Sequence, residues 1–274
     1  MNERPAVTWL GHATVVLELG GARLLTDPVL RDRVIHLRRQ VAPPDPAALR
    51  DVDAVLISHL HFDHLDVPSL RRLGDGVRIV APRGAGEYLR GRGFRRVLEL
   101  AAGESLAVGG AQVSAVPAEH DGRRHPRGSF AEPVGFVVSG SPRVYFAGDT
   151  DVFAGMADLA GGVDVALLPI WGWGPTLGPG HMDPLGAATA LTLIRPAVAV
   201  PIHWGTLAGP GAWWRDDPEM PARQFAKLAS AYAEVRVLAP GGFLELGGAP
   251  PPGRGRPRSA RSDREGPGGA GPPG

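Results

Sequence analysis

The stretch Asp53-Ala-Val-Leu-Ile-Ser-His-Leu-His-Phe-Asp-His64 decides the fold, because four metal-binding side chains directly follow a short apolar run. In an extended or tightly turning segment, side chains two positions apart share a face, so His59 and His61 can bind one cation. The next turn directs Asp63 and His64 toward a second cation. Imidazole nitrogens and a carboxylate suit zinc, and manganese or iron can use the same atoms. The pattern predicts a strand that delivers ligands to a metal.

Further candidate ligands follow apolar runs later in the chain. We expect strands over residues 111–118, 143–147 and 197–202, whose length and apolar character are typical of buried strands. These strands end at or just before His120, Asp149 and His203. With the first cluster they make five histidines and two aspartates, enough for two triads and a bridging carboxylate. A surface loop that is merely rich in histidine is the alternative, and it leaves the downstream ligands unexplained.

Several short motifs resemble those of the metallo-β-lactamase superfamily. The pattern His-x-His-x-Asp-His lies at residues 59–64, and His120, Asp149 and His203 follow in that family's order. Five strings resemble the branch that includes N-acyl-phosphatidylethanolamine phospholipase D and the ascorbate-phosphate lactonase-like hydrolases. They are Leu10-Gly-His-Ala-Thr14, Leu25-Thr-Asp-Pro28, Phe146-Ala-Gly-Asp-Thr150, His181-Met-Asp-Pro184 and Ile202-His-Trp-Gly-Thr206. The similarity extends from Val7 to Phe243.

The resemblance implies an α+β fold, a four-layer αββα sandwich of two mixed β-sheets with flanking helices. It also implies two divalent metal ions, zinc first and manganese or iron as alternatives, with a metal-bridging hydroxide as the nucleophile. In the family's pattern the first ion is held by His59, His61 and His120, the second by Asp63, His64 and His203, and Asp149 bridges them.

His181 lies in the loop Gly178-Pro-Gly-His-Met-Asp-Pro184, whose glycines and prolines oppose regular structure until Asp183 can cap a helix. Such a loop can hold an imidazole over the metals as a proton donor or as a clamp on the developing oxyanion. The resemblance places His181 at the rim of the site; a supporting or exposed histidine is the alternative. His181 and the ligand Asp63 are therefore the candidate catalytic residues.

Three classes of function follow from these features. The branch resemblance favours a metal-dependent hydrolase that acts on a phosphodiester, in the manner of a phospholipase D. A lactonase or other carboxylic-ester hydrolase can use the same hydroxide and is the first alternative. A non-catalytic metal-binding regulatory protein is the second, although the complete ligand set argues against it. The expected partner is a small-molecule or lipid substrate; no basic, aromatic nucleic-acid module is evident, so no nucleic acid is expected.

We expect one domain, residues 1–246, followed by a tail, and the resemblance implies that this domain is a metallo-β-lactamase-fold hydrolase domain. The 274 residues are 43% hydrophobic and include no cysteine, so any metal must bind imidazole and carboxylate groups. No signal sequence and no long apolar run is evident, which predicts a cytoplasmic protein with at most peripheral membrane contact. Residues 247–274 are rich in Gly, Pro and Arg, and this composition predicts disorder.

Turn signals and periodicity predict the remaining elements. We expect a hairpin within residues 7–26, in which residues 15–19 turn at Gly20-Gly21 into residues 23–26, and a strand over residues 163–169. Helices are expected around residues 68–72, 84–90, 184–194 and 218–231.

Two features bear on the substrate. Residues 28–46 carry four arginines among Val34, Ile35 and Leu37. This segment is interpreted either as a basic lip that attracts phosphate or anionic lipid, or as a plain solvated helix. Aromatic side chains flank the predicted loops on the ligand side, where they can bind an acyl chain, a sugar or a base. They are Trp171, Trp173, Trp204, Trp213 and Trp214.

The sequence gives weaker indications about the roles of four further residues. Asp27 ends a predicted strand and can accept a hydrogen bond from the free ring nitrogen of a ligand histidine. His12 can support the pocket in a similar way, although turn roles explain both residues almost as well. His36 and His125 lie among arginines and prolines, so surface positions are expected. His125 also competes with His120 as a ligand, but His120 ends the strand.

Overall fold

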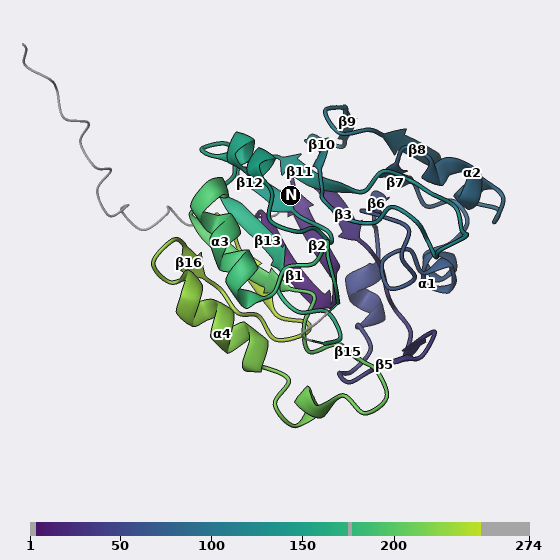
Figure 1. Ribbon diagram of the computed structural model, residues 1–274. Coiled ribbons are helices and arrows are strands. Elements are labelled where there is room, and N and C mark those ends of the chain that lie inside the picture. The colour runs from purple at the N-terminus through teal and green to yellow at the C-terminus, as the bar shows by residue number, and fades with distance from the viewer. Residues whose placement is uncertain (1–3, 175–176, 248–274) are drawn as a thin grey trace, which may run out of the picture.

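The computed structural model describes residues 4–174 and 177–247, which form two seven-stranded β-sheets flanked by helices (Figure 1). The first sheet has the order β17 (Phe243–Glu245), β1 (Ala6–Gly11), β2 (Thr14–Leu19), β3 (Ala22–Thr26), β6 (Ala54–Leu56), β7 (Ile79–Pro82) and β8 (Val97–Leu100). The second has the order β16 (Glu234–Val235), β14 (Val198–Ile202), β13 (Val165–Pro169), β12 (Arg143–Phe146), β11 (Val134–Ser139), β10 (Ala111–Pro117) and β9 (Ser105–Val108).

Both sheets are mixed. Strands β17, β1, β2 and β3 pair antiparallel, whereas β3, β6, β7 and β8 pair parallel. In the second sheet β9 to β12 are antiparallel, and β12, β13, β14 and β16 are parallel. Because parallel strands end at the same edge, the loops after β6, β12 and β14 are each delivered to one edge of their sheet.

The helices form the two outer layers. They are α1 (Val67–Arg72), α2 (Ala85–Arg90), α3 (Pro184–Ile194) and α4 (Met220–Ala229). Figure 1 shows α3 and α4 on one flank of the sheets, and α1 and α2 on the opposite flank. Short 3₁₀ helices complete the described elements: η1 (Pro46–Leu49), η2 (Ala154–Leu159) and η3 (Trp213–Asp216). The arrangement is the predicted four-layer α+β sandwich.

Two hydrophobic cores hold these layers together. Val15 and Leu17 of β2 belong to the larger core, which also contains Phe136 and Tyr145 of the second sheet. The intervening Val16 belongs to a separate core with the residues of α1 and α2. Side chains alternate between the faces of a strand, so β2 is buried on both faces, and four of its six residues are apolar.

A third sheet of three short strands was not expected. It contains β4 (Arg33–Val34), β5 (Leu37–Arg39) and β15 (Leu207–Ala208). The hairpin turn between β4 and β5 gives Ile35 a φ of 52°, which β-branched residues rarely adopt. The interpretation of residues 28–46 as a solvated helix is wrong, because the segment pairs as a hairpin with residues that follow β14.

The predicted elements agree closely with the observed ones. The helix expected over residues 184–194 is α3, and Asp183 caps it by accepting a hydrogen bond from the Gly186 backbone nitrogen at 2.7 Å. The expected hairpin is β2–β3, whose turn residues Gly20 and Gly21 both have positive φ. In the described part of the chain, the structure has no helix long and apolar enough to cross a membrane. The expected tail lies outside the described residues, apart from Gly247.

Candidate metal centre

All seven predicted metal ligands lie near one another in space. They come from the segments after β6, β10, β12 and β14, so both sheets contribute to the site. Together with His12, which lies between β1 and β2, they form two groups of side chains, each with one potential ligand atom per residue within 4.8 Å of the others. One group contains His59, His61 and His120, and the other contains His12, Asp63, His64 and His203.

The first group consists of three imidazoles that face one another. Nδ1 of His61 lies 2.9 Å from Nε2 of His120 and 3.1 Å from Nε2 of His59. The opposite nitrogens of the outer rings are engaged: Nδ1 of His120 lies 2.8 Å from the Gly180 carbonyl, and Nδ1 of His59 lies 2.9 Å from Ser58 Oγ. Donation from His120 to that carbonyl leaves its Nε2 lone pair directed at the centre of the group.

The second group brings His64 and His203 together, with their Nε2 atoms 3.0 Å apart. Oδ2 of Asp63 lies 3.7 Å from each of these two nitrogens. On its far side, Nδ1 of His64 lies 2.8 Å from Oδ2 of Asp27, so the ring can donate to a carboxylate. This is the contact with a candidate ligand histidine that the sequence led us to expect of Asp27.

Asp149 lies between the two groups. Its Oδ2 is 3.1 Å from Nε2 of His64, and its Oδ1 is 3.3 Å from Nε2 of His203. It also forms a third possible ligand group with His120 and His181. Within the described residues, Oδ1 of Asp149 is buried and makes no hydrogen bond, which leaves a carboxylate oxygen available to a cation. This position suits a carboxylate shared by two metal ions.

The charge states of the side chains fit divalent metal ions. Burial lowers the pKa of His59 well below its usual value and that of His120 to about 4, so these rings are neutral ligands near pH 7. Burial acts to raise the pKa of Asp149, but His203 and His64 outweigh it and hold that pKa well below the usual range. Burial also opposes the charge on His64, yet Asp149 and Asp63 raise its pKa well above 6.5. The two carboxylates thus attract positive charge to this position.

Close packing around Ser58 positions the ligand loops. Ser58 donates its backbone N–H to Oδ1 of Asp27 at 2.8 Å and its hydroxyl to Oδ2 at 2.5 Å. Gly148, just before Asp149, has a φ of 63°, and a Cβ there would lie 2.5 Å from the Ser58 Cβ. Only glycine allows the loop after β12 to approach the loop after β6 this closely.

His12 lies within the candidate site, in keeping with the expectation that it can support the pocket. Its Nε2 lies 2.9 Å from Oδ2 of Asp63, and its ring centre lies 3.9 Å from that of His203. Burial lowers the pKa of His12 to about 3, so the neutral ring can donate Nε2–H to the carboxylate. The sequence signal for His12 was the motif Gly11-His12 at the turn between β1 and β2, but this motif does not reveal that Asp63 is its hydrogen-bond partner.

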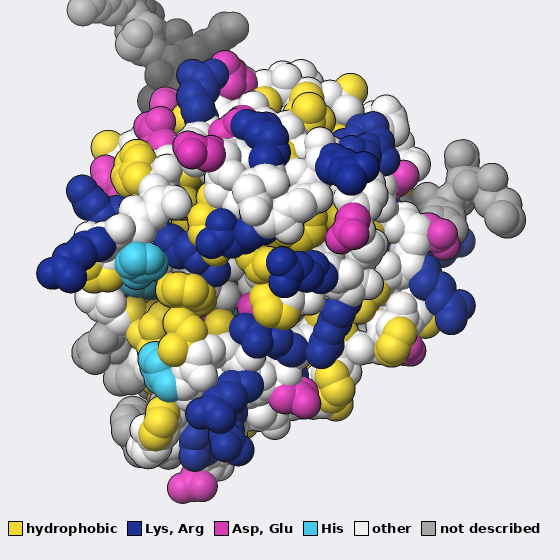
Figure 2. All heavy atoms as spheres, turned by 90° about the vertical axis from the view of Figure 1, so that its right-hand side faces the viewer, with side chains coloured by type: hydrophobic (Ala, Val, Ile, Leu, Met, Phe, Trp, Pro, Cys, Tyr) yellow, Lys and Arg dark blue, Asp and Glu magenta, His cyan; other side chains and the backbone are white. Residues whose placement is uncertain are grey.

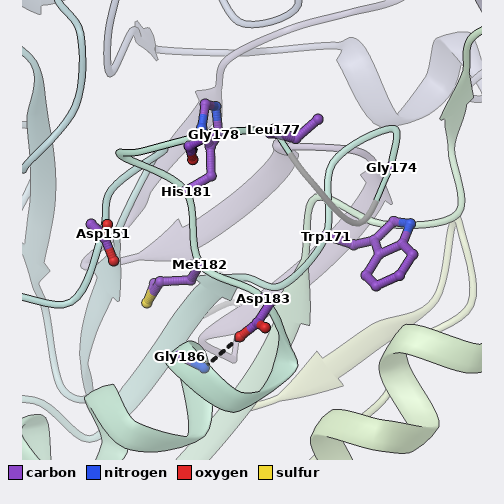
Figure 3. A pocket seen from close by; sticks show the side chains of 9 residues that line it. All are labelled: Asp151, Trp171, Gly174, Leu177, Gly178, His181, Met182, Asp183 and Gly186. Carbon is purple, nitrogen blue, oxygen red and sulfur yellow. Dashed lines mark hydrogen bonds between the residues drawn. The ribbon is translucent and has the colours of Figure 1, made fainter.

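His181 lies at the rim of the centre, as expected. Its Nε2 is 3.5 Å from Oδ2 of Asp149, its ring centre is 4.6 Å from that of His120, and its side chain is 15% exposed. Figure 3 shows His181 on the loop above one hollow, whose other lining residues include Asp151, Trp171 and Asp183. His181 therefore has access both to Asp149 and to open space.

A second hollow, of about 280 Å³, adjoins the same site and has a largely apolar wall. Its lining residues are Val34, Ile35, His36, Leu37, His61, Phe62, Asp63, Trp173, Leu177 and His181. The neighbouring arginines make other contacts: Arg31 binds the Asp66 carboxylate at 2.8 Å, and Arg39 donates to the Val29 carbonyl. The hairpin thus presents apolar side chains to this hollow, while its Arg33 and Arg38 are exposed to solvent.

The remaining aromatic and histidine side chains lie in different surroundings. His36 and His125 are exposed, as predicted, so His120 and not His125 joins the ligand group. Trp204 is a core residue, because it is 4% exposed and stacks on Trp9 with ring centres 4.9 Å apart. Trp171 and Trp173 each line one of the hollows, whereas the side chains of Trp213 and Trp214 lie outside the described part.

Comparison with known proteins gives consistent matches. A family model described as the Beta-lactamase superfamily domain matches residues 22–204. A metal-dependent hydrolase of Methanopyrus kandleri is 36% identical over 254 residues, which cover 87% of this chain and 99% of that protein. An N-acyl-phosphatidylethanolamine-hydrolyzing phospholipase D 1 of Caenorhabditis elegans is 33% identical over 228 residues, or 73% of this chain and 63% of that protein.

The fold is also found among solved structures. A metallo hydrolase from Ignicoccus hospitalis superposes with a TM-score of 0.67 at 24% identity, covering 88% of this chain and 98% of that one. Together with the histidine and aspartate cluster, these matches indicate a metal-dependent hydrolase. The chain belongs to the metallo-β-lactamase superfamily.

Proposed function

We propose that the protein is a binuclear metal-dependent phosphodiesterase that cleaves a phospholipid-like substrate. The observation that carries the proposal is the convergence of two ligand groups on Asp149, which approaches both. In this proposal one ion would be held by His59, His61 and His120, the other by Asp63, His64 and His203, with Asp149 between them. When bound, ions such as Zn²⁺, Mn²⁺ or Fe²⁺ supply an acidified water and neutralise charge that builds on substrate oxygens.

The chain's own residues prepare and complete this chemistry. Asp27 orients the ring of His64, and His12 orients the carboxylate of Asp63, so both ligands are held in place before substrate binds. His181 is our candidate general acid: its Nε2 lies beside Asp149 at the open rim, where it can donate a proton to the leaving alkoxide oxygen.

The apolar hollow supports a substrate with an alkyl or acyl group next to the scissile bond. Phe62 and Ile35 line this hollow together with His61 and Asp63, so an apolar group bound there would adjoin the reacting centre. Ile35 is 56% exposed although it is large and apolar, and its positive φ is strained. Such a side chain at the mouth of a site gains burial when an apolar ligand binds.

Surface charge supports an anionic substrate. The face that carries α1, α2 and β5 is rich in arginine side chains, with apolar side chains among them (Figure 2). A positive field raises the local concentration of anions, and a phosphodiester is anionic at pH 7. The similarity to the phospholipase D of Caenorhabditis elegans points in the same direction, since that protein's name describes a phosphodiester lipid.

Substrate series test this proposal. We expect metal-loaded protein to hydrolyse bis(p-nitrophenyl) phosphate, with kcat/KM for alkyl p-nitrophenyl phosphates rising from methyl to octyl. Ile35→Ser should flatten this rise, whereas Phe243→Ser, which changes a similarly exposed apolar residue on β17, should not. Faster turnover of lactones or p-nitrophenyl acyl esters than of every phosphodiester would contradict the proposal and favour a carboxylic-ester hydrolase.

Metal content tests the binuclear part separately. Elemental analysis of protein purified without chelator should give up to two metal ions per chain. The Asp149→Ala substitution should remove at least one of them, because this carboxylate lies between both ligand groups. His125→Ala changes an exposed histidine and serves as the control with unchanged content. Full occupancy in a His61→Ala, Asp149→Ala double variant would refute the ligand assignment.

A further inference from the structure

We propose that Arg124 is a positioning residue that fixes the metal-binding loop, residues 59–64. Its Nη1 donates to the carbonyl oxygens of Leu60 at 2.5 Å and of Leu65 at 3.1 Å. These two carbonyls lie on either side of His61, Asp63 and His64 in the chain. One guanidinium nitrogen therefore ties the beginning of the ligand-bearing turn to its end.

The surroundings of Arg124 explain how a cation is tolerated there. Arg124 is 7% exposed, and buried arginines are rare because the loss of hydration is costly. Its guanidinium carbon lies 4.1 Å from the ring centre of Phe62 and 4.7 Å from that of Tyr88. Two carbonyls and two aromatic faces thus replace water around the charge. This arrangement fixes the plane of the guanidinium as well as its position.

Arg124 also connects the two sheets at the site. It lies four positions after His120, in the loop between β10 and β11 of the second sheet, whereas the loop it binds follows β6 of the first sheet. Its own loop is closed by hydrogen bonds from Arg124 N to Ser129 O at 2.9 Å and from Ala131 N to Gly122 O at 3.0 Å. The relative placement of His120 and His61 therefore depends on the contacts of Arg124.

This role predicts an effect on metal binding that is independent of any substrate. Misplaced ligands bind a metal more weakly, and loss of residues that orient ligands typically lowers affinity about 10- to 100-fold. We expect Arg124→Gln to weaken Co²⁺ binding by about 10-fold and to change the visible absorption spectrum of the cobalt protein. Arg124→Lys should recover part of the affinity, because an ammonium can donate to a carbonyl but cannot stack as a plane.

The experiment is a Co²⁺ titration of metal-depleted protein, followed by absorbance and by competition with a chelator. Arg123→Gln is the matched control: this exposed neighbour makes a loose contact of 3.8 Å with Asp121, so its affinity and spectrum should stay unchanged. Tyr88→Leu removes one aromatic face below Arg124 without touching the loop and should give an intermediate loss.

The outcomes distinguish positioning from general stability. A lower melting temperature of the metal-depleted Arg124→Gln protein, with wild-type Co²⁺ affinity and spectrum, would overturn the proposal. If circular dichroism shows that Arg124→Gln does not fold, the Arg124→Lys and Tyr88→Leu variants decide. Unchanged Co²⁺ affinity in both variants would overturn the proposal. Weaker Co²⁺ binding with an altered absorption spectrum would support it. Because no substrate is used, failure of the proposed phosphodiesterase activity leaves this result intact.

Discussion

At the scale of single residues, hydrogen bonds to the outward-facing nitrogens of the histidine rings hold the site in place. His64 contacts Asp27, His120 contacts a backbone carbonyl, and His59 contacts the Ser58 hydroxyl, each through the nitrogen that faces away from the centre. These contacts select the tautomer and the ring orientation before any cation arrives. Preorganised ligands bind more tightly because less conformational freedom is lost on binding.

His181 gives the sharpest test at this scale. If it donates a proton to the leaving group, His181→Ala should lower kcat by about 10²- to 10⁴-fold for substrates with poor leaving groups and leave metal content intact. Substrates with p-nitrophenolate leaving groups should lose much less, because they need less protonation. Measuring kcat across a series of leaving-group pKa values checks this expectation. Equal losses across the series would reduce His181 to a structural residue, and loss of metal would make it a ligand.

At the scale of elements, helix α3 fixes one end of the His181 loop. Asp183 and Gly186 form the helix cap directly after His181 and Met182, as Figure 3 shows. The short hydrogen bond and the proline at the first helical position define where the loop stops and the helix begins. The cap therefore contributes both to stability and to the placement of the rim histidine.

Removing the Asp183 cap tests its contribution to stability separately from its contribution to the placement of His181. Asp183→Ala should destabilise the fold by about 1 kcal/mol and also lower kcat, since the His181 loop loses its fixed end. Asp45→Ala removes an equivalent cap from η1, where Asp45 accepts a hydrogen bond from the Ala47 backbone nitrogen at 2.8 Å. It should affect stability alone. Thermal melting and steady-state kinetics measure the two effects, and equal kcat in both variants would show that α3 does not position His181.

Elements with local signals could be predicted from the sequence, and contacts between distant segments could not. Helix α3 has a cap and a proline at its start, and the strands before the ligands are short apolar runs, so their bounds were predicted within a few residues. The sheet formed by β4, β5 and β15 depends on pairing between segments far apart in the chain. The contacts of His12 with Asp63 and of Arg124 with Leu60 are equally non-local.

At the scale of the whole molecule, the candidate ligands come from both sheets, and five of the seven are buried. Several histidines at this junction have lowered pKa values, with burial as the largest cause. In the unfolded chain these rings bind protons near pH 6.5, whereas in the folded chain His120 does so only near pH 4 and His12 near pH 3. Their contribution to stability is therefore complete above pH 6.5 and is lost progressively as the pH falls.

Metal-depleted protein should accordingly melt at lower temperature as the pH falls from 6.5 to 4. His64 acts in the opposite direction, since its raised pKa stabilises the fold at low pH. More histidines have lowered pKa values than raised ones, so the destabilising effect should dominate. We expect the melting temperature to decrease by at least about 5 °C, because each kcal/mol lost from the free energy of unfolding lowers the melting temperature of a domain of this size by about 2–4 °C. Calorimetry at fixed ionic strength measures it. A constant or rising midpoint over this interval would contradict the expectation.

The stacked pair of Trp9 and Trp204 has a practical consequence. Trp204 directly follows His203 in the chain, and the indole nitrogen of Trp9 donates to the carbonyl of His12, which also accepts the backbone N–H of His203. The electronic transitions of two stacked indoles couple, and the resulting circular dichroism band depends on the angle between the rings, here 27°. We expect a rearrangement of His203 to change that angle through these bonds, so the circular dichroism band can serve as an optical probe for the state of the second ligand group.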